Sequence, residues 1–168
     1  IINDEYSRDI SVKVRSQLYA SMRKGNYVGA FAPYGYKKSC KDKNKLIPDK
    51  EVTDTINDIF YLRSQGYSLK KNADCLNDKK VLTPFELRKK NKEKFRTPFQ
   101  KNVELSEKKR KWYPQTVSRI LGNEIYAGVL SQGKNRKINY KLGKNVKEDR
   151  ENWIVCEKKE LAVVETEL

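Results

Sequence analysis

The sequence predicts a mainly α fold of the α+β class, in which several helices accompany a small antiparallel β-hairpin. Two observations support this prediction: apolar residues recur at helical spacing in four segments, and two short β-rich runs follow the last of them. With 168 residues the chain can hold one ordinary domain and an appendage. A content of 37% hydrophobic and 35% charged residues implies a thin core.

The first helix is expected from about Tyr6 to Lys24, because neither Gly nor Pro interrupts this stretch and Gly25 is placed to cap its end. Its apolar positions recur every four residues: Ile10, Val14, Leu18 and Met22. The other faces of the helix are basic. They could contact nucleic acid or could simply be a solvated surface. Because the chain begins Ile-Ile-Asn-Asp, we expect it to be a fragment whose helix continues upstream.

The segment from Gly29 to Tyr36, Gly-Ala-Phe-Ala-Pro-Tyr-Gly-Tyr, is expected to be an extended arm. A helix interior tolerates neither its Pro nor its Gly residues. Small residues allow close backbone approach, aromatic faces lie between them, and cations flank both ends, a mixture that suits a nucleic-acid groove. Tyr34 and Tyr36 have a competing role as core residues that fasten the arm to the body.

A polar turn over residues 41–45 precedes the second helix, which Pro48-Asp49 opens. The apolar face of this helix is expected to be core: Val52, Ile56, Ile59 and Phe60. Asp54 and Asp58 lie on the opposite side, where a solvated acidic face explains them better than a metal site that lacks further ligands.

A third helix is expected between Ser68, placed as its N-cap, and a stop near Lys79, with Leu69, Ala73 and Leu76 in line. Gly66 ends the preceding helix, so the connection is short. This spacing predicts a helix-turn-helix-like unit.

The fourth helix follows a long basic insertion, residues 85–111, which we expect to be a mobile loop with some transient helix. Trp112-Tyr113-Pro114 begins the helix, and Gly122 ends it. Its buried side is expected to be Val117, Ile120 and Leu121. Its outer face carries side-chain types that read base edges, although every amphipathic helix has a polar face. These residues are Gln115, Thr116, Ser118 and Arg119.

Two short strands, from Tyr126 to Leu130 and from Trp153 to Val155, are expected to pair as the small antiparallel sheet. A Lys- and Asn-rich loop that contains Lys134 and Arg136 separates them.

Composition favours a nucleic-acid partner. Lys and Arg outnumber Asp and Glu 37 to 22, and a net charge of +15 calls for a polyanion, although Lys-rich surfaces also serve solubility. Histidine is absent, which excludes Ser-His-Asp and Cys-His catalysis and zinc sites that need imidazole. The three cysteines are isolated, which is typical of reduced thiols in a cytosolic protein. No apolar run of 18 residues occurs, and we expect neither a membrane partner, a metal nor a cofactor.

Taken together and in order, four blocks resemble the recombinase domain of large serine recombinases, the family that integrates, excises and transposes mobile elements. The blocks are residues 7–36, residues 47–77, the run Val81-Leu82-Thr83-Pro84, and residues 112–128 with their Asn-x-x-Tyr-x-Gly end. The long Lys-rich insertion before Trp112 departs from the family pattern.

The resemblance implies a parent site-specific recombinase of bacterial, phage or mobile-element origin. Its resolvase-like catalytic domain, whose serine links to DNA within a synaptic tetramer, would lie outside this sequence, as would the family's zinc ribbon. Residues 1–24 would then end the linking helix, residues 25–160 form the DNA-binding domain, and residues 161–168 begin the connection to the zinc ribbon. We therefore expect no catalytic residue here and no activity of the chain alone. The parent is expected to form dimers or tetramers through the catalytic domain.

Double-stranded attachment-site DNA is the expected partner. The end of the first helix would meet the backbone near the crossover site, the arm would follow the minor groove, and the fourth helix would enter the major groove. The candidate DNA-binding residues are Arg15, Tyr19, Arg23, Lys24, Tyr27, Phe31, Tyr34, Lys37, Lys70, Lys71, Gln115, Thr116, Ser118, Arg119, Lys134 and Arg136.

Two alternatives stay open from the residues alone. A stand-alone helix-turn-helix regulator would share the charge and the helix pattern, but it would need no helix entering from upstream. A catalytic fragment, such as a nuclease or a tyrosine-type recombinase, could draw on ten tyrosines, but it lacks the histidine that such sites use to stabilise the transition state.

Overall fold

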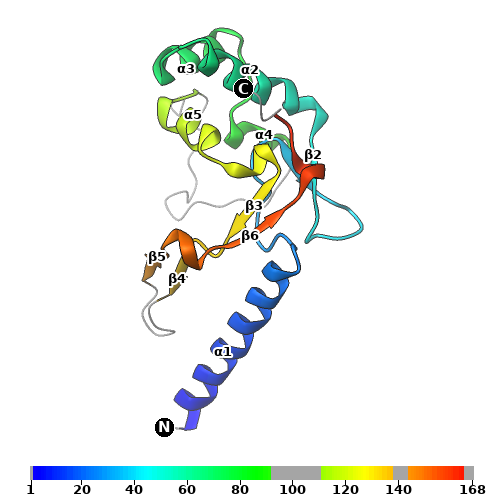
Figure 1. Cartoon of the computed structure of the whole chain (residues 1–168), viewed down its shortest axis with the longest axis vertical. Coiled ribbons are helices and arrows are strands. Elements are labelled where there is room, and N and C mark those ends of the chain that lie inside the picture. Colours follow the sequence, from blue (N-terminus) through cyan, green and yellow to red (C-terminus); the bar gives the residue numbers. More distant parts are fainter. Residues whose placement is uncertain (1, 92–110, 138–143, 165–168) are drawn as a thin grey trace. The chain divides into compact units, whose positions relative to one another are not determined.

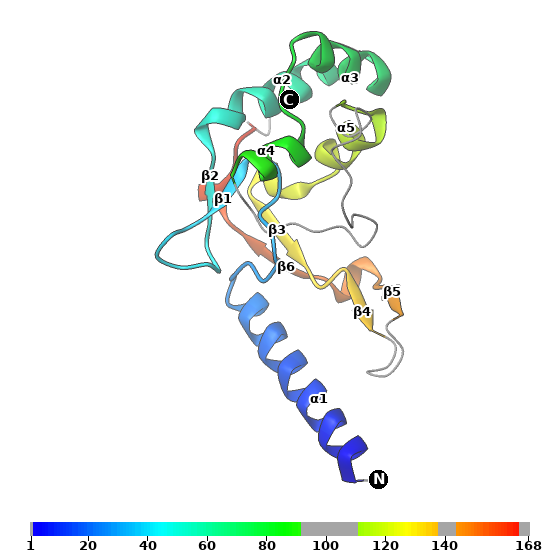
Figure 2. The same ribbon diagram turned by 180° about the vertical axis from the view of Figure 1, so that it is seen from behind.

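A computed structural model describes residues 2–91, 111–137 and 144–164 (Figures 1 and 2). Among these residues it contains five α-helices, short 3-10 helices and three antiparallel two-stranded sheets, which confirms the mainly α, α+β class. The chain divides into two compact units. The described residues of the first unit are 2–49 and 124–164, and those of the second unit are 50–91 and 111–123.

Helix α1, Ile2–Arg23, opens the first unit and begins earlier than the sequence predicted. Gly25 ends it as expected, with a φ of 76° and its N–H donating to the Met22 carbonyl. The predicted apolar stripe exists, but Ile10, Val14 and Leu18 are exposed, Leu18 with 44% of its surface, and Met22 is half-buried. The C-terminal end of α1 contacts β6 (Ile154–Glu157), where the Cys156 thiol donates to the Met22 carbonyl at 3.5 Å.

The predicted arm is fastened to the first unit rather than extended away from it. Its last residue, Tyr36, begins strand β1 (Tyr36–Lys38), which pairs antiparallel with β2 (Leu46–Pro48). The buried Tyr36 hydroxyl shares its proton between the carbonyl oxygens of Leu161 at 2.7 Å and Ile125 at 3.1 Å. Of the two roles open to Tyr36, the core role is confirmed.

Two aromatic rings hold the middle of the first unit together. Tyr36 and Tyr126 stack with ring centroids 5.7 Å apart, and the Tyr126 hydroxyl donates to the Tyr34 carbonyl at 2.8 Å. The arm is thus tied from both of its tyrosines to the segment that follows the fourth predicted helix.

Strands β3 (Val129–Gln132) and β6 (Ile154–Glu157) pair antiparallel, which confirms the predicted sheet. The predicted first strand was placed too early, because Glu124–Ala127 forms the 3-10 helix η2. A further pair, β4 (Asn135–Lys137) with β5 (Asn145–Lys147), occupies the expected basic loop, whose residues 138–143 lie outside the described residues. Two more 3-10 helices complete this unit: η3, Arg150–Asn152, and η4, Lys159–Leu161.

The second unit is a cluster of helices around α2 (Lys50–Ser64), α3 (Leu69–Asp78) and α5 (Pro114–Leu121), which all contact one another. The predicted N-cap of α3 is confirmed, since the Ser68 hydroxyl accepts the Lys71 N–H at 3.2 Å. The buried residues of these helices are Val52, Ile56, Ile59, Asn72, Ala73, Leu76, Val117 and Ile120.

The expected basic loop at residues 85–111 is more ordered at its start than predicted, because Pro84–Lys90 forms helix α4. A capping box begins this helix: the Thr83 side chain accepts the Glu86 N–H, and the Glu86 carboxylate accepts the Thr83 N–H at 2.9 Å. Leu87 is the buried residue of this helix. Residues 92–110 of the same expected loop lie outside the described residues.

Candidate nucleic-acid interface

Helix α5 presents the polar face that the sequence predicted. Gln115, Ser118 and Arg119 are exposed, and Thr116 is half-buried. On the opposite side, Val117 has 0% of its surface exposed. The helix is therefore held by its apolar side and offers amide, hydroxyl and guanidinium groups on the other, the groups that pair with base edges.

The chain leading into α5 is fixed by contacts within the second unit. The Trp112 N–H donates to Asn77 Oδ1 at 2.7 Å, and the Trp112 indole N–H donates to the Val81 carbonyl at 3.0 Å. Sequence reasoning missed Asn77 as a functional candidate, because its partner lies 35 positions away.

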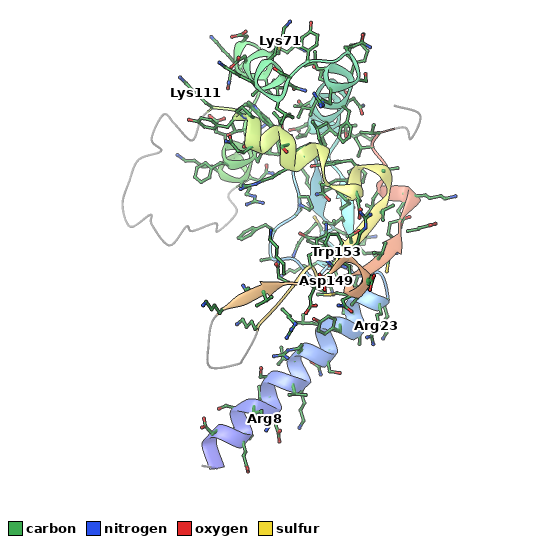
Figure 3. All side chains as sticks on the ribbon, turned by 60° about the vertical axis from the view of Figure 1, so that its left-hand side comes forward. Arg8, Arg23, Lys71, Lys111, Asp149 and Trp153 are labelled. Atoms are coloured by element: carbon green, nitrogen blue, oxygen red, sulfur yellow. The ribbon has the colours of Figure 1, made fainter. Side chains whose placement is uncertain are left out.

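Helix α3 carries two of the candidate cations of the second unit, Lys70 and Lys71, both exposed. The Lys71 ammonium lies 4.3 Å from the centroid of the Tyr67 ring, a cation–π contact that restricts it to the start of the helix. Figure 3 shows Lys71, and Lys111 just before α5, at the outer surface of this unit.

Lys79, at the end of α3, is committed elsewhere. It forms an ion pair with Asp58 at 2.7 Å, and this hydrogen bond raises the pKa of Lys79. The acidic face of α2 thus neutralises a neighbouring cation, in keeping with its predicted solvated role.

The first unit brings three candidate residues from distant segments to one groove. Arg15 and Tyr19 of α1 and Arg136 of β4 line a cavity of about 360 Å³, together with apolar side chains of the α1 stripe. Arg136 also pairs with Glu148, so part of its charge is already balanced. Arg23 and Lys24 are exposed at the end of the same helix, where Figure 3 labels Arg23.

Three aromatic candidates are half-buried: Tyr27, two residues before the arm, and Phe31 and Tyr34 within it. The Tyr27 hydroxyl donates to the Phe31 carbonyl at 2.6 Å, which closes the arm into a compact turn. Lys38 supports this turn from β1, since its ammonium donates to the Gly29 carbonyl at 2.5 Å.

Lys37 has a partner inside the protein. Its ammonium lies 2.9 Å from the carboxylate of Asp49, whose side chain is only 4% exposed. A buried carboxylate needs a compensating charge, so a structural role competes with DNA contact at this position.

Lys134 belongs to a cluster around Trp153 that sequence reasoning did not find. The Lys134 ammonium lies 4.6 Å and the Arg150 guanidinium 5.9 Å from centroids of the Trp153 ring system, whose N–H donates to the Glu148 carbonyl. The pairing of Gln132 with Ile154 brings these segments together, and no local spacing reveals that register. Arg150 is also paired with Glu124.

Within residues 2–91, 111–137 and 144–164, no group of three or more His, Cys, Asp or Glu side chains could hold a metal ion. Over the same ranges, no helix has the length and apolar character that a membrane span requires.

Comparison with known proteins places the chain in a family. The family model described as Recombinase matches residues 49–168. No curated protein and no solved structure matches this chain. The match spans more than half of the sequence, so the resemblance noted from its four blocks is confirmed. Membership of this family supports a role in site-specific recombination. The chain belongs to the Recombinase family, whose domain follows the catalytic domain in serine recombinases.

Proposed function

We propose that this chain is the DNA-binding domain of a site-specific serine recombinase and that it binds duplex DNA at an attachment site or element end. The bound DNA serves the integration, excision or transposition of a mobile element, and bond breaking belongs to the catalytic domain of the parent protein. The observation that carries the proposal is the polar face of α5, where Gln115, Ser118 and Arg119 are exposed while Val117 and Ile120 on the other side are buried.

In this proposal α5 reads bases in the major groove, and the cations of α3 hold phosphates beside it. The net charge of +15 supplies the attraction that brings the duplex to the protein. The groove lined by Arg15, Tyr19 and Arg136 in the first unit is a second contact with the DNA backbone. The arm, with its aromatic rings, approaches the minor groove.

Salt dependence tests the electrostatic part. If six to ten phosphates are neutralised, affinity for duplex DNA falls by roughly 10³ to 10⁵ between about 50 and 200 mM salt. Fluorescence anisotropy of a labelled duplex measures this slope. An affinity that does not respond to salt contradicts the proposal.

The role of α5 is tested by comparing Arg119→Ala with Lys70→Ala on a duplex selected from a randomised pool and on its scrambled version. A bidentate base contact by Arg119 gives a loss of about 1 to 3 kcal/mol on the selected duplex only. Lys70→Ala weakens both duplexes alike, because a phosphate contact carries no sequence information. Equal losses on both duplexes for Arg119→Ala reassign that residue to the phosphates.

A catalytic role for this fragment is tested with supercoiled plasmid and Mg²⁺. The proposal expects binding without nicking, and reproducible cleavage overturns it. A stand-alone regulator is distinguished by the selected sequence: recombination sites from the ends of a mobile element favour the recombinase, whereas promoter sequences alone favour the regulator.

A further inference from the structure

One side chain of α3 holds the backbone immediately before α5. Asn77 accepts the Trp112 N–H through Oδ1 at 2.7 Å, and its Nδ2 donates to the Trp112 carbonyl at 3.1 Å. The side-chain amide thus satisfies both backbone groups of one residue, as a neighbouring strand would. Such a pairing fixes the direction of the backbone as well as its position.

The Trp112 side chain adds a second attachment. Trp112 is 3% exposed, and its indole N–H donates to the Val81 carbonyl at 3.0 Å. The turn after α3 fixes the position of this carbonyl. In this turn Lys80 has a φ of 52°, and the Val81 N–H donates to the Leu76 carbonyl. We call the three hydrogen bonds between Trp112 and the residues Asn77 and Val81 the Trp112 latch.

The start of helix α5 has no side-chain cap. The helix is eight residues long, and Tyr113 at its N-cap makes no side-chain capping bond; Pro114 at its first position favours a helix start but fixes only its own φ, not the direction of the chain before it. The latch, two residues upstream, therefore takes the place of a cap in setting the start of the helix.

We propose that Asn77 is a positioning residue for DNA recognition, which sets the direction in which α5 leaves Trp112 and so aligns Gln115 and Arg119 with the bases. This inference rests on the proposed function of α5. Base readout depends on hydrogen bonds that weaken steeply with misalignment, so a small rotation of a short helix removes discrimination. Phosphate attraction tolerates the same rotation, because it depends on charge, and Asn77 carries none.

The matched control lies on the same helix. Asn72 is fully buried, and its Nδ2 donates to the Ile59 carbonyl of α2 at 2.8 Å. Asn72→Ala removes a side-chain-to-backbone hydrogen bond from α3 and weakens the same core, but it leaves the Trp112 latch in place. It separates loss of stability from loss of alignment.

The experiment measures affinity of the 168-residue chain for a duplex selected by the wild-type protein and for a scrambled duplex, well below the melting temperature of each variant. Asn77→Ala is expected to weaken the selected complex about tenfold or more, with the scrambled complex within about twofold and the salt slope unchanged. Asn72→Ala is expected to lower the melting temperature and to keep the wild-type ratio of the two affinities.

Hydrogen exchange adds a readout that does not depend on DNA. The amides of Thr116 and Val117, which donate to the Tyr113 carbonyl at the start of α5, exchange faster in Asn77→Ala and stay protected in Asn72→Ala. If Asn77→Ala does not fold, Trp112→Phe is the second variant. It removes the bond to Val81 and places a smaller ring in the same buried position, but it keeps both backbone bonds to Asn77, so we expect a smaller loss of discrimination in the same direction. An unchanged affinity ratio in folded Asn77→Ala or Trp112→Phe overturns the inference, and so does a fall of the ratio in Asn72→Ala that equals the fall in Asn77→Ala. Failure of the wild-type chain to bind or select any duplex overturns the proposed function instead.

Discussion

Gln132 on strand β3 holds the backbone at Val28, directly before the arm and 104 positions earlier in the chain. Its Oε1 accepts the Val28 N–H at 3.0 Å, and its Nε2 donates to the Asn26 carbonyl at 2.7 Å. Gln132 is buried, so few other groups can replace these bonds. In each unit, therefore, a side-chain amide fixes the backbone just before a candidate DNA-binding segment: Gln132 before the arm, and Asn77 before helix α5.

Replacing Gln132 with Leu, an apolar side chain of similar length, removes its bonds to Val28 and Asn26. We expect the free energy of unfolding to fall by about 1 to 3 kcal/mol, because two neutral hydrogen bonds are lost from a partly buried site. Urea unfolding measures the loss, and hydrogen exchange should show the Val28 amide opening first. Gln115→Leu, on the exposed face of α5, is the control and should leave stability unchanged. A protected Val28 amide in Gln132→Leu contradicts the assigned role.

Alkaline pH tests the tyrosine pair at the centre of the first unit. Burial raises the pKa of Tyr36 and of Tyr126 above the usual value of 10.0. At neutral pH both hydroxyls are protonated, folded or unfolded. As pH rises through about 10, the unfolded chain ionises first, so the free energy of unfolding falls by at most about 1.4 kcal/mol per pH unit for each tyrosine. The loss continues until the folded hydroxyls ionise.

Tyr36→Phe removes one of these two ionisations and should flatten the alkaline part of the stability profile. At neutral pH it should cost about 1 to 3 kcal/mol, since the carbonyls of Ile125 and Leu161 lose their donor. Tyr6→Phe on the exposed surface of α1 serves as the control and should reproduce the wild-type profile. An alkaline profile of Tyr36→Phe identical to wild type would show that another group controls the decline.

We predict that replacing Lys37 lowers the stability of the protein more than its affinity for DNA. Lys37→Gln leaves the Asp49 carboxylate, 4% exposed, without its ammonium partner, whereas Lys37 itself is 48% exposed. We expect a loss of about 1 to 3 kcal/mol, below the 3 to 5 kcal/mol typical of fully buried pairs because solvent screens this one. The double variant with Asp49→Asn should recover much of it. Lys70→Gln should weaken DNA binding without destabilising the protein, and the same behaviour in Lys37→Gln would return Lys37 to the DNA contacts.

Long secondary-structure elements could be predicted from the sequence, and short ones could not. Apolar spacing predicted α2, α3 and α5, and the hydroxyl of Ser68 marked a cap correctly. Strands of three residues, such as Tyr36–Lys38, are too short to show alternation. Helix α4 lies in a charged segment with one buried residue, Leu87, although the Thr83-x-x-Glu86 capping box was a signal that could have found it.

The candidate site likewise contains residues that the sequence predicted and residues that it could not reveal. The outer face of α5 follows from amphipathicity, because burying Val117 and Ile120 necessarily exposes the residues between them. Gln132 and Asn77 could not be predicted, since an amide that pairs with distant backbone looks like any other polar residue in the sequence. The role of Lys37 depends on a partner across the β1–β2 hairpin, a pairing that only the register supplies.

The two apolar faces of the chain should respond very differently to the same deletion. Ile59→Ala and Leu18→Ala remove equal numbers of carbon atoms, but Ile59 is 0% exposed within the second unit and Leu18 is 44% exposed on α1. Ile59→Ala should lower the free energy of unfolding by about 2 to 5 kcal/mol, because it leaves a cavity among α2, α3 and α5. Leu18→Ala should change it by about 0.5 kcal/mol or less, since water already reaches that side chain. Chemical denaturation followed by circular dichroism measures both. A loss for Leu18→Ala that matches Ile59→Ala, and grows with protein concentration, would mean that the α1 stripe is covered in solution by a second copy of the chain.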